Sequence, residues 1–308
     1  MKNLILSTIF LITLFSLCSM PDIGFLNFQN QNQSLQPGVS AIIDSGSPDI
    51  YFKANIPVTE VRAGREIQIS FELDNKQSRE LKDVNLTVYD HPCFISGNFT
   101  NFMASIKLNQ TRMWTWIWKS DPSINLQKIC PIRFKLSYES DYSHFQDIAV
   151  LPEGEYYQRE SEGTLGNVPI GSTSSSSPLD IQLTFSENQP LIANQSYFMY
   201  INYLNTGEGY FDSSKIPNPD ITLSSPVNIA INSSHCGDYR SVSANNYHLE
   251  PKDGNGNLIN LLFLRGKATP TTCEFITNSV PAMDIKSLSL TATYKYELDN
   301  SISITVNP

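Results

Sequence analysis

Two short stretches of the sequence bring together side chains that could do chemistry. HPCFISGNFT (91–100) and NSSHCG (232–237) each hold a histidine, a cysteine and an asparagine sequon. A zinc site needs about four converging ligands, usually with a C-x-x-C or H-x-x-x-H spacing, and neither stretch supplies them. The four histidines of the chain are His91, His144, His235 and His248. Because the fold would have to recruit distant histidines, we expect no metal site.

Four of the five cysteines form two pairs with equal spacing. Cys93 and Cys130 are 37 positions apart, and so are Cys236 and Cys273. In an exported chain an even set of cysteines predicts disulfides, so we pair Cys93 with Cys130 and Cys236 with Cys273. Metal ligation and free thiols are the alternatives. The equal spacing also predicts that the two stretches are copies of one structural element.

The segment RMWTWIWK (112–119) contains every tryptophan of the chain. In a strand, Trp114, Trp116 and Trp118 would point to the same side. They could form a flat platform that stacks against sugar rings. Alternatively, they could face the core, where tryptophan buries a large apolar area. Both faces of the segment are apolar, which favours the core.

The stretch KDGNGN (252–257) places Asp253, Asn255 and Asn257 at the spacing of a calcium loop. It lacks the glycine at the sixth position and the glutamate at the twelfth that such a loop requires. We therefore interpret it as a hairpin turn before a strand at LINLLFL (258–264).

No local motif identifies an enzyme. The sequence has no nucleophile elbow, no phosphate-binding glycine loop and no dinucleotide fingerprint. A catalytic triad can assemble from distant residues, so a small exported hydrolase is an alternative. It would require a histidine and carboxylates in one concave pocket. We expect no catalytic residue and no cofactor.

Alternation of apolar and polar residues is the main structural signal. A period of two predicts half-buried strands, and it occurs at residues 66–75, 84–88, 131–139 and 287–297. Each half also ends in a predicted strand, polar turn and strand, at KLSYESDYSHFQDIAV (135–150) and TATYKYELDNSISITV (291–306). These elements predict an all-β protein of two tandem immunoglobulin-like antiparallel β-sandwiches.

Changes in composition divide the chain. Residues 1–20 have the short positive start and apolar run of a signal peptide. Residues 21–48 form a polar leader or stalk. We assign residues 49–151 and 179–308 to the two sandwiches, and the acidic, then serine-rich, residues 152–178 to a flexible linker.

The amino-terminal apolar run predicts export, because it is shorter than a bilayer span. An uncleaved anchor is the alternative. Cys18 follows this run, as a lipidated cysteine would, but Leu17 stands where a small residue is expected. We expect a secreted or cell-surface protein whose membrane contact is limited to the signal peptide, an uncleaved anchor or lipidated Cys18.

The net charge and the glycosylation sequons bear on two further questions, namely nucleic-acid binding and modification by glycans. The net charge is −9 and the lysines and arginines are scattered, so nucleic-acid binding lacks an electrostatic basis. Glycosylation requires exposed sequons. The N-x-S/T sequons are at Asn32, Asn85, Asn98, Asn109, Asn194 and Asn232.

TEVRAGREIQISFELDNKQSRELKDVNLTVYD (59–90) resembles the opening of cell-adhesion-related (CARDB-type) and other immunoglobulin-like modules of archaeal and bacterial surface proteins. Their pattern is a glycine, an alternating strand that ends in asparagine, a polar turn and a second strand. QPLIANQSYFMYINYLNTGEG (189–209) resembles the same opening, with Ala193 and Asn194 in place of the glycine. The resemblance implies an exported β-sandwich for spacing, adhesion or envelope assembly, without shared catalytic residues.

These observations predict two copied halves, whose matched strands end at Asn75 and Asn205. We expect a secreted or cell-surface structural or interaction protein of adhesion type, without catalysis. Its partners would be other cell-surface proteins or envelope glycans. A glycan-binding module that uses the tryptophan face is the second hypothesis, and the exported hydrolase is the third.

Overall fold

The computed structural model describes residues 50–214, 217–236, 239–243 and 245–308. The predicted signal peptide, the polar leader, Cys18 and Asn32 lie outside the described residues. Within them the protein is all-β, as predicted, with several antiparallel sheets and one short α-helix.

Within the described residues, the first half of the chain contains seven strands before the first long strand. They are β1 (Ile50–Asn55), β2 (Glu60–Arg62), β3 (Glu66–Asn75), β4 (Leu81–Asp90), β5 (Phe94–Ser96), β6 (Thr100–Ile106) and β7 (Gln110–Ser120). The long strand β8 (Lys128–Leu151) follows. It leads into α1 (Glu153–Ser161), the 3-10 helix η1 (Leu165–Asn167) and β9 (Ser172–Ser174).

The second half repeats this arrangement and ends in the second long strand. Its strands are β10 (Leu179–Phe185), β11 (Leu191–Ile192), β12 (Ser196–Asn205), β13 (Tyr210–Phe211), β14 (Asp220–Ser224), β15 (Ile229–Cys236), β16 (Tyr239–Ser243), β17 (Asn246–Leu249), β18 (Thr271–Thr277) and β19 (Asp284–Asn307).

Among the described residues the strands form two small sheets and one large sheet. Sheet A has the order β1-β3-β7-β5 and sheet C the order β10-β12-β18-β15. Sheet B has the order β16-β17-β14-β19-β8-β4-β6, with β2, β9, β11 and β13 paired at its sides. Sheet A packs on sheet B through Phe71 and Phe134, whose ring centroids are 5.2 Å apart. Sheet C contacts sheet B where the Tyr142 hydroxyl accepts the Ile181 N–H at 3.0 Å.

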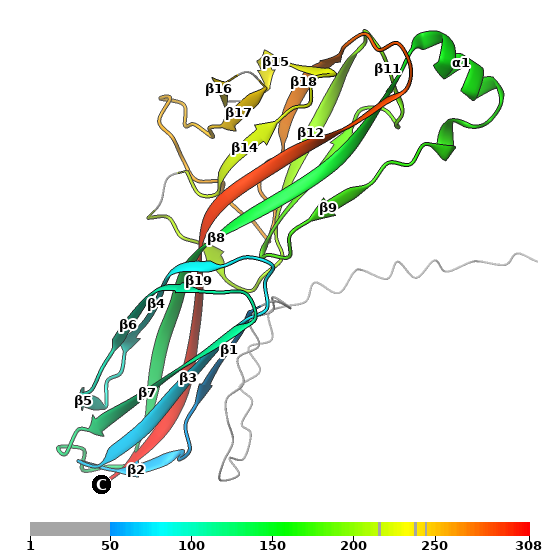
Figure 1. Ribbon diagram of the computed structural model, residues 1–308. Helices are drawn as coiled ribbons and strands as arrows, with labels where there is room; N and C mark the ends of the chain where they lie inside the picture. The colour runs from blue at the N-terminus through cyan, green and yellow to red at the C-terminus, as the bar shows by residue number, and fades with distance from the viewer. Residues whose placement is uncertain (1–49, 215–216, 237–238, 244) are drawn as a thin grey trace, which may run out of the picture. The chain divides into compact units, whose positions relative to one another are not determined.

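The two long strands, β8 and β19, lie side by side over their whole length (Figure 1). Each has 24 residues, and their antiparallel register runs from Lys128–Val306 to Val150–Asp284. The predicted polar turns at residues 135–150 and 291–306 are therefore wrong. The polar run Glu139–Asp141 simply continues the alternation, because Ser140 points inward and is fully buried.

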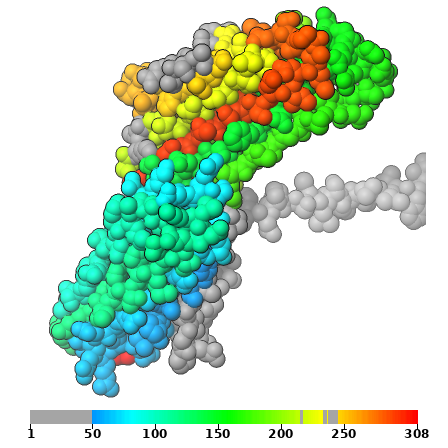
Figure 2. Space-filling model, viewed as in Figure 1, coloured from blue at the N-terminus to red at the C-terminus, as the bar shows by residue number. Residues whose placement is uncertain are grey.

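The long strands exchange their ends between the halves. The first part of β8 pairs with β4 of its own half, whereas its last residues pair with β11 of the second half. In the same way β19 begins beside β14 and ends beside β2 of the first half. In the space-filling view, the red carboxyl end accordingly lies against blue residues of the first half (Figure 2).

This exchange changes the predicted division of the chain. Residues 49–151 and 179–308 are not self-contained, because each half takes its last strand from the other. Residues 152–178 also differ from the predicted flexible linker. They contain α1 and η1, and β9 pairs with β8 at residues 144–146.

The matched asparagines Asn75 and Asn205 form the same turn in both halves. Each Nδ2 donates to the carbonyl four residues later, at 2.9 Å and 2.8 Å. Each Oδ1 accepts the N–H two residues later, at 3.0 Å and 3.1 Å. Gly64 and Asn194 also correspond, with φ of 75° and 59°. The predicted match between the two openings therefore has a structural basis.

A second repeated contact, which the sequence did not reveal, involves Ser120 and Thr277. The Ser120 hydroxyl accepts the Arg65 N–H at 3.1 Å and lies 3.0 Å from the carbonyl of the same residue. The Thr277 hydroxyl makes the corresponding contacts with Gln195, both at 3.2 Å. Both side chains are fully buried, so each half closes the same loop with one hydroxyl.

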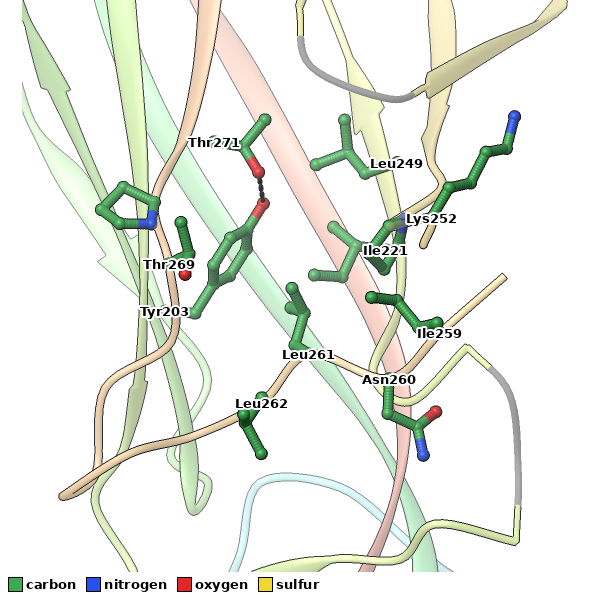
Figure 3. Close-up of a pocket in the computed structure, with 12 residues that line it drawn as sticks. Tyr203, Ile221, Leu249, Lys252, Ile259, Asn260, Leu261, Leu262, Thr269 and Thr271 are labelled. Carbon is green, nitrogen blue, oxygen red and sulfur yellow. Dashed lines mark hydrogen bonds between the residues drawn. The ribbon is translucent and has the colours of Figure 1, made fainter. Parts of the chain in front are cut away.

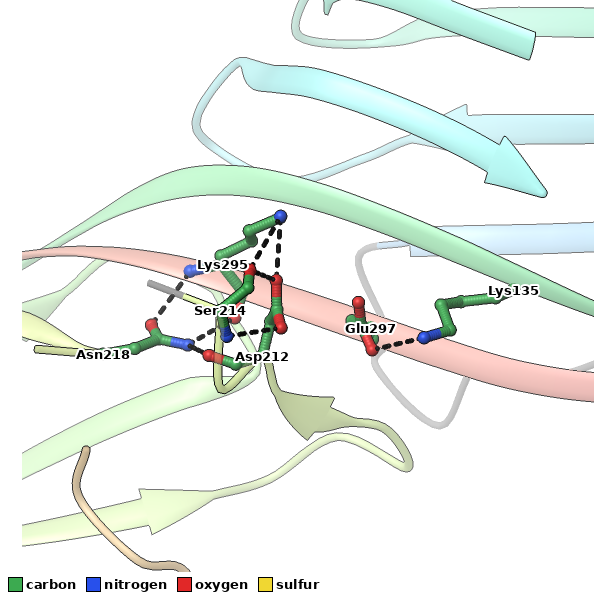
Figure 4. A network of polar contacts seen from close by, with 6 residues as sticks. All are labelled: Lys135, Asp212, Ser214, Asn218, Lys295 and Glu297. Atoms are coloured by element: carbon green, nitrogen blue, oxygen red, sulfur yellow. Dashed lines mark hydrogen bonds and ion pairs between the residues drawn. The ribbon is translucent and has the colours of Figure 1, made fainter. Parts of the chain in front are cut away.

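Polar contacts hold β19 where it passes from one half to the other (Figure 4). The Lys295 ammonium lies 2.8 Å from the Asp212 carboxylate, and the Lys295 N–H donates to Asn218 Oδ1 at 3.0 Å. Further along the strand, Lys135 of β8 pairs with Glu297 at 3.0 Å. Asn218 is fully buried, so its amide replaces the strand partner that β19 lacks between β13 and β14.

Candidate interaction surface

Both predicted disulfides form, but they occupy different places in the two halves. Cys93–Cys130 joins the residue before β5 of sheet A to β8 of sheet B. Cys236 and Cys273 are directly opposite each other on β15 and β18 of sheet C. The first cysteine of each pair is at the matching edge strand, β5 or β15, but the second is on β8 in one half and on β18 in the other. The equal spacing therefore does not correspond to equivalent bonds.

The tryptophan face points into the core. Trp114, Trp116 and Trp118 are at most 7% exposed, and the Trp118 Nε1–H donates to the Asn98 carbonyl at 2.7 Å. A sugar ring cannot stack on these indoles, so the proposed platform does not exist. Met113 and Ile117, on the opposite face, are the exposed large apolar side chains of β7.

The histidines lie in separate surroundings. The His91 ring stacks on Phe99, with centroids 3.8 Å apart. His144 is buried, and desolvation lowers its pKa. His248 lies 3.1 Å from the Asp220 carboxylate, while the side chain of His235 lies outside the described residues. In the described part of the chain, no three His, Cys, Asp or Glu side chains converge as metal ligands would.

A polar cavity of about 330 Å³ on the outer face of sheet B contains His248, Asp220 and Asp141. It meets the requirement for a histidine with carboxylates in one pocket, and the Thr222 hydroxyl lies 3.5 Å from His248 Nδ1. Thr222 is in the middle of β14, which pairs with β17 on one side and β19 on the other. Its neighbouring backbone amides are therefore committed to strand pairing and cannot stabilise an oxyanion.

The Asp253 stretch forms a turn that is held by its own side chains. Asp253 Oδ1 accepts the N–H groups of Asn255 and Asn257, both at 2.9 Å. These bonds lower the pKa of the Asp253 carboxyl. The predicted turn is confirmed, but the strand expected at residues 258–264 does not form.

The described sequons differ in exposure. Asn98, Asn109 and Asn194 are exposed. Asn85 is half-buried on β4, and Asn232 donates its side-chain amide to the Glu274 carboxylate at 2.7 Å. Exposure therefore favours the first three sites for glycosylation.

The halves depart from each other at one large insertion. Three residues, 107–109, connect β6 to β7, whereas residues 250–270 connect the corresponding strands β17 and β18. The inserted loop is tied to β12 at its end, where the Asn205 N–H donates to the Gly266 carbonyl at 2.7 Å and the Ala268 N–H to the Tyr203 carbonyl at 3.1 Å. Loops that are held in place by a rigid scaffold often contain the residues that bind a ligand or a partner protein.

This insertion exposes several large apolar side chains. Leu262 is 71% exposed and Leu264 is 67% exposed, while Leu258 and Ile259 of the same loop are 38% and 39% exposed. Several exposed apolar side chains on one loop make it a candidate interaction site. The sequence signal was the run LINLLFL, which is too apolar for a surface loop without a partner.

Two cavities flank the exposed leucines. The first, of about 260 Å³, lies between the loop and residues such as Tyr203, Ile221 and Leu249. In Figure 3 the side chains of Leu261 and Leu262 point in opposite directions, and Leu261 points toward Tyr203 and Ile221. The second cavity, of about 480 Å³, lies between the loop and β13.

Comparisons with known proteins assign no family. No protein-family model matches the chain, and no curated protein matches it. Among solved structures it is similar to the secreted serine protease VesC from Vibrio cholerae, with 6% identity, 84% of this chain and 52% of that chain covered, and a TM-score of 0.21. The chain thus spans about half the length of that protein, and so low a score supports no conclusion about fold or activity.

We also searched the structure for helices that could span a membrane. Within the described residues, no helix combines the length and the hydropathy that crossing a bilayer requires.

Proposed function

We propose that the chain is a secreted or cell-surface interaction protein of adhesion type, without catalytic activity. In this proposal the two halves are tandem immunoglobulin-like sandwiches that share β8 and β19, and other cell-surface proteins are the partners. The two disulfides support an extracellular setting, because such bonds persist in oxidising compartments. The CARDB-type resemblance implies the same role.

One observation carries the proposal. Leu262 and Leu264 project from the insertion at residues 250–270, where the second half departs from the first. Exposed apolar side chains cost solubility, and a soluble surface retains them where they meet a partner. The corresponding turn of the first half, at residues 107–109, is only three residues long.

The two alternatives receive less support. The glycan hypothesis loses its platform because the three tryptophans are buried. The hydrolase hypothesis retains the polar cavity around His248, but this cavity has no free pair of backbone amides near Thr222.

The test uses the full chain produced in its own host. We expect the double change Leu262→Ser and Leu264→Ser to release the protein from cells into the medium, because the apolar contact is lost. Leu108→Ser is the matched control, since Leu108 is 48% exposed in the short turn of the first half. Equal partition of wild type, double variant and control would overturn the proposal.

A further inference from the structure

The inserted loop contains an extended segment, Asn260–Leu264, that resembles a strand with one free edge. Two amides at the beginning of the segment donate hydrogen bonds to other parts of the chain. The Ile259 N–H donates to the Pro251 carbonyl at 2.8 Å and the Leu261 N–H to the Asn218 carbonyl at 3.3 Å. In the described part of the chain, the amides of Asn260, Leu262 and Phe263 make no backbone hydrogen bond, whereas the Leu264 N–H donates to the Lys267 carbonyl at 2.8 Å.

The side chains of the segment alternate as they would in a strand. Leu261 and Phe263 are partly buried, and the Phe263 ring stacks on Phe211 with centroids 4.5 Å apart. Leu262 and Leu264 are exposed. The segment therefore has a buried face, an exposed face and an edge with unused amides.

A buried polar atom in the same segment also lacks a partner. The Asn260 Oδ1 is inaccessible to solvent and accepts no hydrogen bond within the described residues. An unsatisfied buried acceptor costs about 1–3 kcal/mol.

The free amides distinguish between two classes of partner for the apolar surface. A lipid bilayer could accept the leucine side chains, but it offers no acceptor for backbone N–H groups at hydrocarbon depth. An extended polypeptide satisfies both the amides and the leucines, because strand addition supplies main-chain hydrogen bonds along an exposed edge. The backbone therefore favours a peptide.

Two positively charged side chains at one end of the segment indicate how a bound peptide would be oriented. Arg265 and Lys267 follow the segment directly, are exposed, and take part in no ion pair among the described residues. Lys252, near the other end of the loop, already pairs with Glu250 at 3.2 Å. In a chain of net charge −9, two free cations beside apolar side chains complement an acidic group on the partner.

We propose that Asn260–Leu264 is a docking edge for an extended peptide segment of a partner protein. The segment adds as a strand beside Leu262 and places apolar side chains in the two flanking cavities. A carboxylate at one end of the segment lies against Arg265 and Lys267. This inference rests on the proposed function and names the chemistry of its partner.

The probe is a fluorescent ten-residue peptide in which leucine or valine alternates with serine and two glutamates stand at one end. Binding to the full chain is measured by anisotropy. We expect the Leu262→Ser, Leu264→Ser double variant to weaken binding more than tenfold, and Leu108→Ser to leave it unchanged. N-methylation of alternate peptide amides should also lower the binding affinity more than tenfold, because it removes main-chain hydrogen bonds without removing side chains.

Charge reversal provides an independent readout. Lys267→Glu should weaken binding of the glutamate peptide and strengthen binding of the same peptide with lysines in place of the glutamates. Thermal unfolding of each variant confirms that it is folded. Equal affinity of the methylated and unmethylated peptides would overturn strand addition. No response to Lys267→Glu would overturn the placement of the carboxylate.

The remaining outcomes separate the two proposals. Binding to phosphatidylcholine–phosphatidylglycerol vesicles that depends on Leu262 and Leu264, without peptide binding, would replace the peptide with a lipid surface. Loss of cell association in the double variant, combined with no peptide binding, would leave the proposed function standing and reject the docking edge.

Discussion

Glu139 on β8 lies directly opposite Lys295 on β19, in the middle of the register that joins the two long strands. The strands correspond end to end, because the carbonyl of Leu151 accepts the Ala193 N–H at 2.8 Å and the carbonyl of Asn307 accepts the Ala63 N–H at 2.7 Å. The exchange of strands is thus symmetric about the Glu139–Lys295 pair, and each half depends on the other for its last strand.

The first prediction tests this dependence. Ile304, close to the carboxyl end, is 1% exposed and lies opposite Cys130 in the first half. Ile304→Ala should destabilise the protein by about 2–5 kcal/mol, the usual cost of such a cavity. The three tryptophans all lie on β7, so tryptophan fluorescence during denaturation reports on the first half.

Ile148→Ala is the matched variant for the other end of the exchange. Ile148 is fully buried on β8 and lies beside the second half, opposite Lys286. We expect a similar loss of stability when unfolding is followed by circular dichroism. The second half should begin to unfold before the first. If Ile304→Ala left the tryptophan transition unchanged, the pairing of β19 with the first half would be wrong.

The second prediction concerns Gly97, which has a φ of 148° and faces the Trp118 ring. Gly97→Ala should lower the melting temperature and shift the tryptophan emission, because the added Cβ collides with the indole and this backbone conformation disfavours alanine. Gly154→Ala in α1 is the control. Its Cβ would meet no neighbouring atom, so stability should stay unchanged or rise by about 0.5–1 kcal/mol. An unchanged melting temperature in Gly97→Ala would contradict the close packing of Gly97 against the Trp118 ring.

The third prediction concerns pH. Burial lowers the pKa of His144, so the folded state resists protonation more than the unfolded chain does. The stability linked to this residue is therefore complete above the unfolded pKa, which is about 6.5, and declines as the pH falls below it. His144→Leu should reduce the loss of melting temperature between pH 7 and pH 5. His91→Gln, which changes the half-buried ring stacked on Phe99, is the comparison. Equal acid sensitivity of His144→Leu and wild type would reject this assignment.

The fourth prediction concerns the disulfides. Peptide mapping of the unreduced protein should recover only the pairs Cys93–Cys130 and Cys236–Cys273. Each closes a loop of equal length, so chain entropy predicts a loss of about 4 kcal/mol when either pair is changed to alanine. Chemical denaturation of the two double variants measures these losses. Recovery of any peptide that links the two halves would contradict the structure.

The sequence was sufficient for local elements but not for their connection. Alternation located β3 and parts of β4, β8 and β19. The strand-ending residues Asn75 and Asn205 identified the repeat, because the same side-chain turn is needed in both halves. The run Glu139–Asp141 fits a turn as well as a strand, because three polar residues follow one another. Only the partner strand β19 decides between them.

The candidate site was harder to predict than the fold. Cysteine spacing identified both bonds but not their places, because equal separation along the chain does not fix which sheets the residues join. The segment at residues 258–264 is apolar enough for a buried strand, yet no neighbouring strand pairs with it along its length. The hydrophobicity of a segment cannot show whether a pairing partner is present.

The reciprocal closure by β8 and β19 has an evolutionary consequence. Two identical subunits that swap their last strands would pair them in the same way, so the chain has the topology of a swapped dimer fused through residues 152–178. Recombination that transfers one half alone would deliver a fragment without its closing strand. Selection would therefore keep the two halves together in one gene as a single heritable block.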